Sequence, residues 1–226
     1  MTRTAFIAAL PAELKSLVAG WRHQRRNGVD LWHHRDDNLY VAACAGMGQD
    51  AATRAFAEVE ADAPIDLVFS LGWAGALRSG TAPGSAHNVA GVIDTRTGER
   101  FRCDAESGSL WLVTSPTVAG EAEKLRLAET YAASLVDMEA AAIARLAAAR
   151  GIPFYAIKGV SDSLNDPLPD FNPFLAPNGR LRTARFTLYA LLHPRYWPAL
   201  ARMGENSKKA ARAIRDVLIE FLDERA

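Results

Sequence analysis

Short apolar runs alternate with helix-forming segments along most of the chain. The runs have the length and apolar content of buried strands, and they lie at 4–10, 39–45, 65–72, 86–94, 110–114, 134–136 and 154–160. Helical patterns follow or separate them at 12–21, 50–61, 120–131, 138–150 and 206–224. This alternation predicts an α/β fold, in which helices cover a parallel or mixed sheet. The polar stretch 95–101 contains Thr97-Gly98 and predicts a hairpin tip.

The 226 residues suit a single domain spanning 1–226. We find no internal repeat, low-complexity tract or linker. An irregular stretch at 162–180 contains four prolines, and loops of that length inside a compact domain are usually functional or mobile. The C-terminal part of the domain, 166–226, includes most of this stretch and is rich in basic and aromatic residues.

Charge and cysteine content exclude several classes of protein. Lys and Arg together number 26, as do Asp and Glu, so no global positive field exists for binding nucleic acid. No apolar run approaches the roughly 18 to 20 residues of a membrane span, and we see no signal peptide, so a cytoplasmic location is expected. Two cysteines, Cys44 and Cys103, favour neither a disulfide framework nor a zinc site.

Three acidic residues follow predicted strands, where open α/β sheets bind their ligands. They are Glu13, Glu139 and Asp162. The residues directly after the strands include no Cys, His or Lys, which excludes an obvious Ser-His-Asp, Cys-His or His-rich metal arrangement. Carboxylates therefore remain as the candidate acid–base groups. Each also has a structural interpretation, as a first-turn helix acid or a turn residue, and the residues alone leave both open.

Gly46 and Gly48 follow the strand predicted at 39–45. They could let backbone N–H groups approach an anion or a sugar at a helix N-terminus. The segment lacks the third glycine of a dinucleotide fingerprint and the Gly-Lys-Ser/Thr of a P-loop. A tight strand-to-helix turn is the structural alternative.

Four segments of the chain carry a family resemblance. The block VDMEAAAIARLAAARGIPFYAIKGVSD at 136–162 resembles the signature of the purine nucleoside phosphorylase and methylthioadenosine/adenosylhomocysteine nucleosidase family. The segments ALPAEL (9–14), AGMGQDAA (45–52) and LVFSLGWAGAL (67–77) resemble further blocks of that family, in the same order. The resemblance covers residues 4–165 and implies a three-layer α/β/α fold with a mixed central sheet. It also implies cleavage of the N-glycosidic bond of a purine nucleoside, without metal or organic cofactor.

The resemblance implies a role for each matching residue. Asp162 would donate a proton toward purine N7, Glu139 would hold the ribose hydroxyls, and Glu13 would activate the attacking water. These roles suit a bond that breaks through an oxocarbenium-like state, because the purine leaves poorly as an anion. The remaining predicted substrate-binding residues are Met138 against the sugar, Thr117 and Val118 along the base, and Ser161, Trp73, Gly72, Gly46 and Gly48.

Two positions depart from the family pattern. Trp73 stands where the hydrolases usually have Ser or Thr, which predicts a pocket of altered shape, although core packing is an alternative. Ser70 stands where phosphorylases have an arginine for phosphate, so we favour water over phosphate as the nucleophile.

The C-terminal part departs further. Residues 180–215 carry nine Lys/Arg and one acid, Glu205. Within it, 180–200 combines basic and aromatic side chains, a pattern that suits an anionic lipid surface. This part resembles the hopanoid-associated branch of the family, which implies adenosylhopane as substrate and peripheral contact with the inner membrane face. For the surface of 180–200, the alternative is a solvated basic face. For the function of the protein, the alternatives are a methylthioadenosine/adenosylhomocysteine nucleosidase and a non-catalytic nucleoside-binding protein. The basic and aromatic residues of 180–200 are Arg180, Arg182, Arg185, Phe186, Tyr189, Arg195, Tyr196 and Trp197.

We also expect the protein to form a homodimer.

Overall fold

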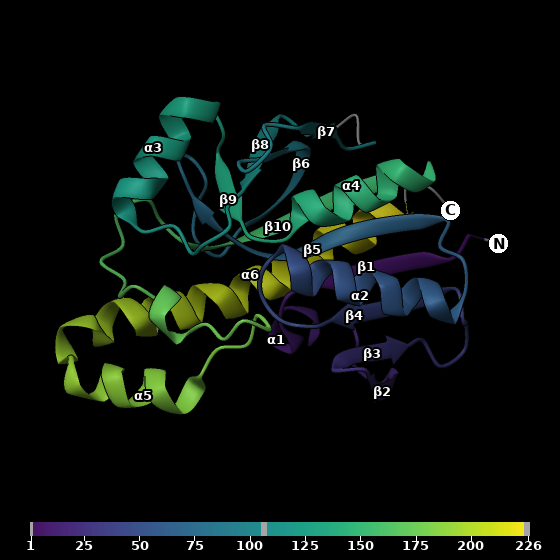
Figure 1. Ribbon diagram of the computed structural model, residues 1–226, viewed down its shortest axis with the longest axis horizontal. Helices are drawn as coiled ribbons and strands as arrows, with labels where there is room; N and C mark the ends of the chain where they lie inside the picture. Colours follow the sequence, from purple (N-terminus) through teal and green to yellow (C-terminus); the bar gives the residue numbers. More distant parts are fainter. Residues whose placement is uncertain (1, 105–107, 224–226) are drawn as a thin grey trace.

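The computed structural model describes residues 2–104 and 108–223 (Figure 1). Strands and helices alternate through most of it. The elements are β1 (Thr4–Ala8), α1 (Pro11–Leu14), β2 (Arg22–Arg26), β3 (Val29–His33), β4 (Tyr40–Cys44), α2 (Gln49–Asp62), β5 (Leu67–Ala76), β6 (Ala86–Asp94), β7 (Arg100–Arg102), β8 (Leu110–Thr114), α3 (Glu121–Tyr131), β9 (Leu135–Asp137), α4 (Ala140–Arg150), β10 (Phe154–Asp162), η1 (Asn172–Phe174), α5 (Thr183–Leu192), η2 (Pro194–Tyr196) and α6 (Trp197–Asp223).

The strands form one mixed sheet in the order β10-β6-β8-β9-β5-β1-β4-β3-β2, with β7 paired to β6. Parallel pairs join β4, β1, β5 and β10, whereas β10–β6 and β5–β9 are antiparallel. Because β10 also pairs with β5, the strands β5, β10, β6, β8 and β9 close into a ring. The α/β fold with a mixed sheet is therefore confirmed.

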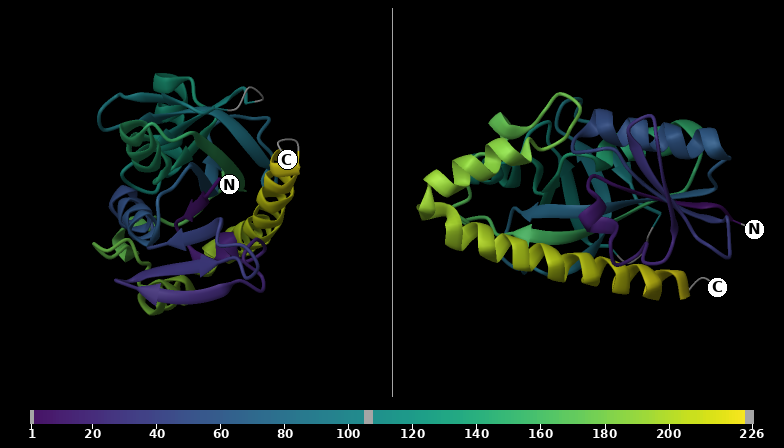
Figure 2. Two further views of the ribbon diagram at one scale, coloured as in Figure 1. Left: turned by 90° about the vertical axis from the view of Figure 1, so that its right-hand side faces the viewer. Right: turned by 90° about the horizontal axis from the view of Figure 1, so that it is seen from below.

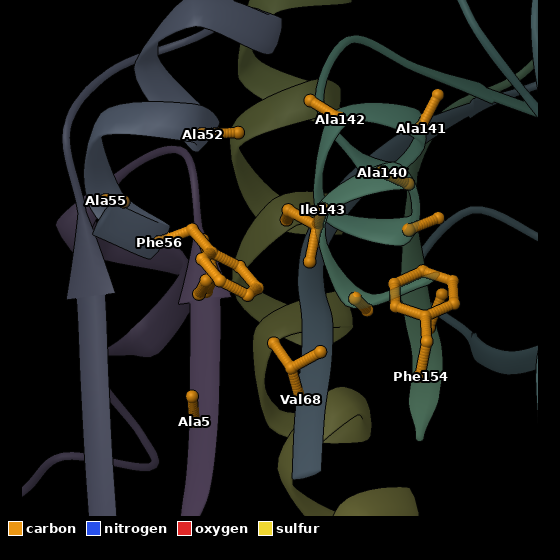
Figure 3. Close-up of a cluster of buried hydrophobic side chains, with 14 of the residues drawn as sticks. Ala5, Ala52, Ala55, Phe56, Val68, Ala140, Ala141, Ala142, Ile143 and Phe154 are labelled. Carbon is orange, nitrogen blue, oxygen red and sulfur yellow. The ribbon is translucent and has the colours of Figure 1, made fainter. Parts of the chain in front are cut away.

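Helices cover both faces of the sheet, and the side chains of each strand alternate between them. In β1, Ala5 and Ile7 face the cluster under α2 and α4, whereas Phe6 and Ala8 face the cluster under α6. Figure 3 shows the first cluster, in which Phe56 of α2 packs toward the sheet. Both clusters are apolar, and Ser70 of β5 and Lys158 of β10 are polar side chains buried within the sheet.

The C-terminal helices form an arm. The helix α6 runs along the sheet face opposite α2 and α4, and its first part extends beyond the sheet beside α5 (Figure 2). No residue of α5 is buried. Trp197 of α6 donates its Nε1–H to the carbonyl of Ala190 in α5 at 2.8 Å, which joins the two helices.

The structure changes the bounds of two predicted helices and adds a helix that was not predicted. The helix predicted at 12–21 ends at Leu14, and turns follow it up to Gly20, whose φ of +84° suits a glycine. The helix predicted at 206–224 begins at Trp197, and Glu224 lies outside the described residues. The helix α5 was not predicted. The irregular interpretation of 162–180 is confirmed, since this stretch carries little beyond η1 after β10 ends. The hairpin at 95–101 is also confirmed, because it joins the antiparallel pair β6 and β7.

Candidate active site

A cavity of about 870 Å³ lies beyond the ends of β5, β9 and β10, with α1, α3 and α6 around it. The loop between Asp166 and Asn172 contributes a further wall. A shallow groove along α6, at Asp216 and Glu220, lies at no strand end. The first cavity brings together most of the predicted site residues, which are Glu13, Trp73, Thr117, Val118, Met138, Glu139, Ser161 and Asp162.

Glu13 is fixed by backbone donors on both of its oxygens. The N–H of Leu10 donates to Oε2 and the N–H of Trp73 donates to Oε1, each at 2.7 Å. Burial raises the pKa of Glu13, which these hydrogen bonds oppose. A Cβ on Gly72 would lie 2.8 Å from Glu13 Oε1, and the φ of Gly72 is +138°. Gly72 therefore makes room for Glu13 and does not itself line the cavity.

Glu139 occupies the N-cap position of α4, which begins at Ala140 and not at 138 as predicted. Its Oε1 accepts the N–H of Gly48 at 2.6 Å, and its Oε2 accepts the N–H of Met138 at 3.2 Å. Burial, followed by repulsion from Asp137, raises the pKa of Glu139 to about 8. A buried carboxyl at a strand end, with such a pKa, is typical of a functional site.

The structure does not place Gly46 and Gly48 at the cavity wall. The N–H of Gly48 is used by Glu139, so it supports that side chain. A Cβ on Gly46 would lie 2.9 Å from the backbone of Gly179, where the neighbouring Met47 N–H donates to the Gly179 carbonyl at 2.7 Å. These glycines therefore shape the loop and its contact with the 162–180 stretch.

A buried ion pair that the sequence analysis missed lies beneath the carboxylates. Lys158 Nζ is 2.9 Å from Asp137 Oδ2 and donates to Ser70 Oγ at 2.9 Å. Asp137 also accepts the hydroxyl of Thr114 at 2.7 Å. The charge of Lys158 lowers the pKa of Glu139, against the effect of burial. Ser70 thus belongs to an internal network in which the cation already has its partners.

Asp162 ends β10 and has a hydrogen bond on each oxygen. The Ser161 hydroxyl donates to Oδ1 at 2.5 Å, and the ammonium of Lys124 forms an ion pair with Oδ2. Lys124 Nζ also donates to the carbonyl of Ser163 at 2.7 Å. The sequence analysis missed Lys124, although its spacing to buried Leu127 on α3 offered a signal that it faces inward.

The comparisons with known proteins agree with this geometry. The sequence model described as "Phosphorylase superfamily" matches residues 95–192, a segment that contains Met138, Glu139 and Asp162. Over that segment, which is less than half of the chain, the resemblance found in the sequence agrees with the superfamily model. No curated protein matches the chain.

Solved structures of the same fold include nucleosidases. A mutant of the Helicobacter pylori MTAN with 5′-methylthioadenosine in its active site aligns with a TM-score of 0.74 at 13% identity, covering 99% of both chains. The 5′-methylthioadenosine/S-adenosylhomocysteine nucleosidase of Neisseria meningitidis aligns with 0.73 at 17% identity, covering 99% of this chain and 100% of the other. Futalosine hydrolase of Helicobacter pylori aligns with 0.70 at 12% identity, covering 97% and 98%. These likenesses show that the chain has the fold of those enzymes.

Trp73 joins two walls of the cavity. It lies on β5, lines the cavity, and donates its Nε1–H to the carbonyl of Ser207 in α6 at 3.0 Å. On the opposite wall, the N–H of Val118 donates to Asn172 Oδ1 at 2.9 Å, and Asn172 Nδ2 donates back to the Val118 carbonyl at 3.0 Å. These contacts hold the arm and the proline-rich loop against the strand ends.

Acidic side chains are numerous in the cavity wall. Among the described residues that line it, Lys124 is the one Lys or Arg. Such a wall stabilises positive charge and disfavours a free anion. The acidic residues that line it are Glu13, Glu121, Glu123, Asp137, Glu139, Asp162, Asp166 and Asp170.

Proposed function

We propose that this protein hydrolyses the N-glycosidic bond of an adenine nucleoside. One observation carries the proposal: Glu13, Glu139 and Asp162, from separate segments of the chain, converge on one cavity beyond the strand ends. Their surroundings differ, since backbone donors fix Glu13 and Glu139 whereas a cation and a hydroxyl bond Asp162. Carboxyl groups in unlike surroundings suit the separate acid, base and binding roles of glycoside cleavage.

Each carboxyl has one role in the proposed reaction. Asp162 hands a proton to N7 of the purine as the bond between C1′ and N9 breaks and the electron pair goes to the base. Glu139 binds the ribose hydroxyls through its carboxyl oxygens. Glu13, held by the N–H groups of Leu10 and Trp73, orients a water molecule toward C1′ and takes its proton. Met138 packs against the sugar, and Thr117 and Val118 lie along the base.

Water is the proposed nucleophile. A phosphate ion would enter a cavity whose lining includes eight carboxyl groups, and Lys124 is already paired with Asp162. The other nearby cation, Lys158, has its partners in Asp137 and Ser70. Neither cation is available to a phosphate without breaking a buried pair, which is costly.

The substrate proposed for this cavity carries an apolar group, with adenosylhopane in hopanoid biosynthesis as the preferred candidate. The proline-rich loop and the arm supply apolar side chains to the cavity, next to Asp166 and Asp170 of the same loop. A small thionucleoside, such as the 5′-methylthioadenosine bound by the Helicobacter pylori nucleosidase, is the second candidate, because the three carboxylates would serve it equally well. The apolar wall residues are Leu168, Phe171, Leu181 and Met203.

Peripheral membrane contact through 180–200 is part of this proposal. Leu188, Leu191 and Leu192 of α5 are 60%, 60% and 69% exposed, and basic residues flank them. Basic and apolar side chains together suit an anionic lipid surface. Phe186 packs instead on Phe171 and Phe174, which anchors the arm to η1. Within the described residues, no helix has the length and hydropathy to cross a membrane. Light scattering would test the expected homodimer, for which a lone monomer at micromolar concentration is the contrary result.

Release of adenine from a panel of nucleosides tests the proposed function. The panel contains adenosine, methylthioadenosine and adenosylhopane, each assayed with the wild type and with Asp36→Asn, an exposed aspartate outside the cavity. We expect release with both proteins and the highest kcat/KM for adenosylhopane. Binding of a nucleoside without any adenine release would favour a non-catalytic nucleoside-binding protein.

A further inference from the structure

Lys124 is a buried cation that the proposed mechanism leaves without a role. It lies on α3, is 4% exposed, and lines the cavity beside Asp162. Burying an ammonium group is costly unless it is paired and hydrogen-bonded. Gly75 leaves the space for the pair, since a Cβ there would lie 3.1 Å from Lys124 Cε and 3.3 Å from Asp162 Oδ2.

The hydrogen bonds around Asp162 bear on where the proton of this pair resides. Both carboxylate oxygens accept, one from the Ser161 hydroxyl and the other from the Lys124 ammonium. A carboxyl group that accepts on both oxygens, one of them from a cation, has the hydrogen bonding of an ionised carboxylate. The mobile proton of the pair then lies on Lys124.

An ionised Asp162 cannot protonate a leaving group by itself. The proposed reaction needs a proton at purine N7 when the C1′–N9 bond breaks. The ammonium group of Lys124, which is paired with Asp162, can supply that proton. Two of its three ammonium protons have acceptors in Asp162 and Ser163. The ion pair therefore provides a direct hydrogen-bonded path from the ammonium to the carboxylate.

We propose that Lys124 is a positioning residue that supplies, through Asp162, the proton taken by the leaving purine. This assignment rests on the proposed function. As the C1′–N9 bond breaks, its electron pair goes to the base. One proton moves from Lys124 to Asp162, and one moves from Asp162 to N7, which leaves Lys124 as the neutral amine. Water forms the new bond to C1′ and loses a proton to Glu13, and exchange with solvent returns Glu13 and Lys124 to their starting states. The net reaction consumes one nucleoside and one water.

Two leaving groups separate proton supply from structural support. Adenine must be protonated as it leaves, whereas 4-nitrophenolate is a stable anion that leaves without a proton. The test compares adenosine with 4-nitrophenyl β-D-ribofuranoside for the wild type, Lys124→Met, Asp162→Asn and the double variant. Lys15→Met, at an exposed position, is the matched control. The proposal predicts that Lys124→Met lowers adenine release on the order of 10²- to 10⁴-fold and changes nitrophenol release by less than about tenfold.

The double variant keeps the proposal testable if the single change disturbs folding. Asp162→Asn already breaks the relay, so adding Lys124→Met should lower adenine release no further, because residues that act as a unit are not additive. Thermal unfolding of every variant checks its fold.

Three outcomes would overturn the relay. Unchanged or faster adenine release by Lys124→Met would show that Asp162 takes its proton from solvent, since removing the cation favours the protonated carboxyl. Equal loss on both substrates, or additive losses in the double variant, would assign Lys124 a structural role. A wild-type chain that releases no adenine from any nucleoside would instead remove the proposed function, and the relay with it.

Discussion

The cavity has two sides that are built in different ways. The strand-end side holds Glu13 and Glu139 in buried positions, each fixed by backbone N–H groups. On the arm side, the lining consists of Leu181 and of Met203 and Ser207 in the first part of α6, whereas α5 beside it (Figure 2) contributes no lining residue. Catalysis needs groups held close to their productive geometry, whereas recognition of an apolar substrate group needs surface. We therefore propose that the first side carries the reaction and the second side selects the substrate.

The largest expected effect is on the strand-end side, at Asp162. Asp162→Asn keeps the shape of the side chain and removes the carboxyl group that hands over the proton. We expect adenine release to fall on the order of 10²- to 10⁴-fold, the usual range for general acid catalysis. Steady-state kinetics on adenosine would measure it, with Asp36→Asn as the control. Near-native turnover would remove Asp162 from the mechanism.

A smaller loss is expected at Glu139. Glu139→Gln keeps an acceptor for the Gly48 N–H but replaces the carboxyl group that binds the ribose with an amide. We expect kcat/KM to fall on the order of 10²- to 10³-fold, as for loss of one group that stabilises the transition state. At acidic pH the free energy of unfolding should change by less than about 1 kcal/mol, because the hydrogen bond remains.

Kinetics and urea unfolding on the same Glu139→Gln protein would test this, with exposed Glu129→Gln of α3 as the control. Intact activity together with lost stability would make Glu139 a structural N-cap residue.

The arm side should respond in the opposite way. Replacing Leu188, Leu191 and Leu192 with Ser removes exposed apolar surface from α5. We expect binding to anionic liposomes to fall by about tenfold or more, while hydrolysis of adenosine stays within about twofold, since these side chains do not line the cavity.

Co-sedimentation at low and high salt measures the liposome binding, and Leu125→Ser on α3, also an exposed leucine, is the matched control. Equal binding of neutral and anionic liposomes by the wild type would argue against electrostatic attraction. An equal loss of binding in the control would argue against a role specific to the arm.

The last expected effect is a pH dependence of stability. Because the pKa of Glu139 is raised from 4.5 to about 8 in the folded state, its protonated form stabilises the fold below pH 4.5. That contribution declines as the pH rises from 4.5 toward 8, where the buried group must ionise. The free energy of unfolding of the wild type relative to Glu139→Gln should therefore fall across this window. A flat difference between the two urea-unfolding series would contradict the raised pKa.

Much of the strand-end side could be predicted from the sequence. The strands Ala86–Asp94 and Leu110–Thr114 match their predicted limits, because continuous apolar runs bounded by polar or turn residues identify buried strands well. Glu13, Glu139 and Asp162 could be singled out because strand ends of an α/β sheet meet at one edge. Their placement at one cavity follows from the same rule.

The arm and the inner ion pairs could not be predicted in this way. The helix α5 has little polar surface and lies between proline-containing segments, so its sequence shows no clear helical start or end. Lys124 reaches Asp162 because α3 packs over Gly75, a contact between segments far apart in the sequence. The pair of Lys158 and Asp137 depends likewise on the middle of β10 meeting the end of β9 in space.

Product analysis in phosphate-free buffer tests the central claim most directly, namely that the strand-end carboxylates direct water onto C1′. The wild type is incubated with the best nucleoside of the panel, and adenine, free sugar and sugar 1-phosphate are quantified with and without added phosphate. The account predicts adenine and free sugar in equal amounts, at a rate that phosphate does not raise. Adenine release that requires phosphate and yields the sugar 1-phosphate would contradict it.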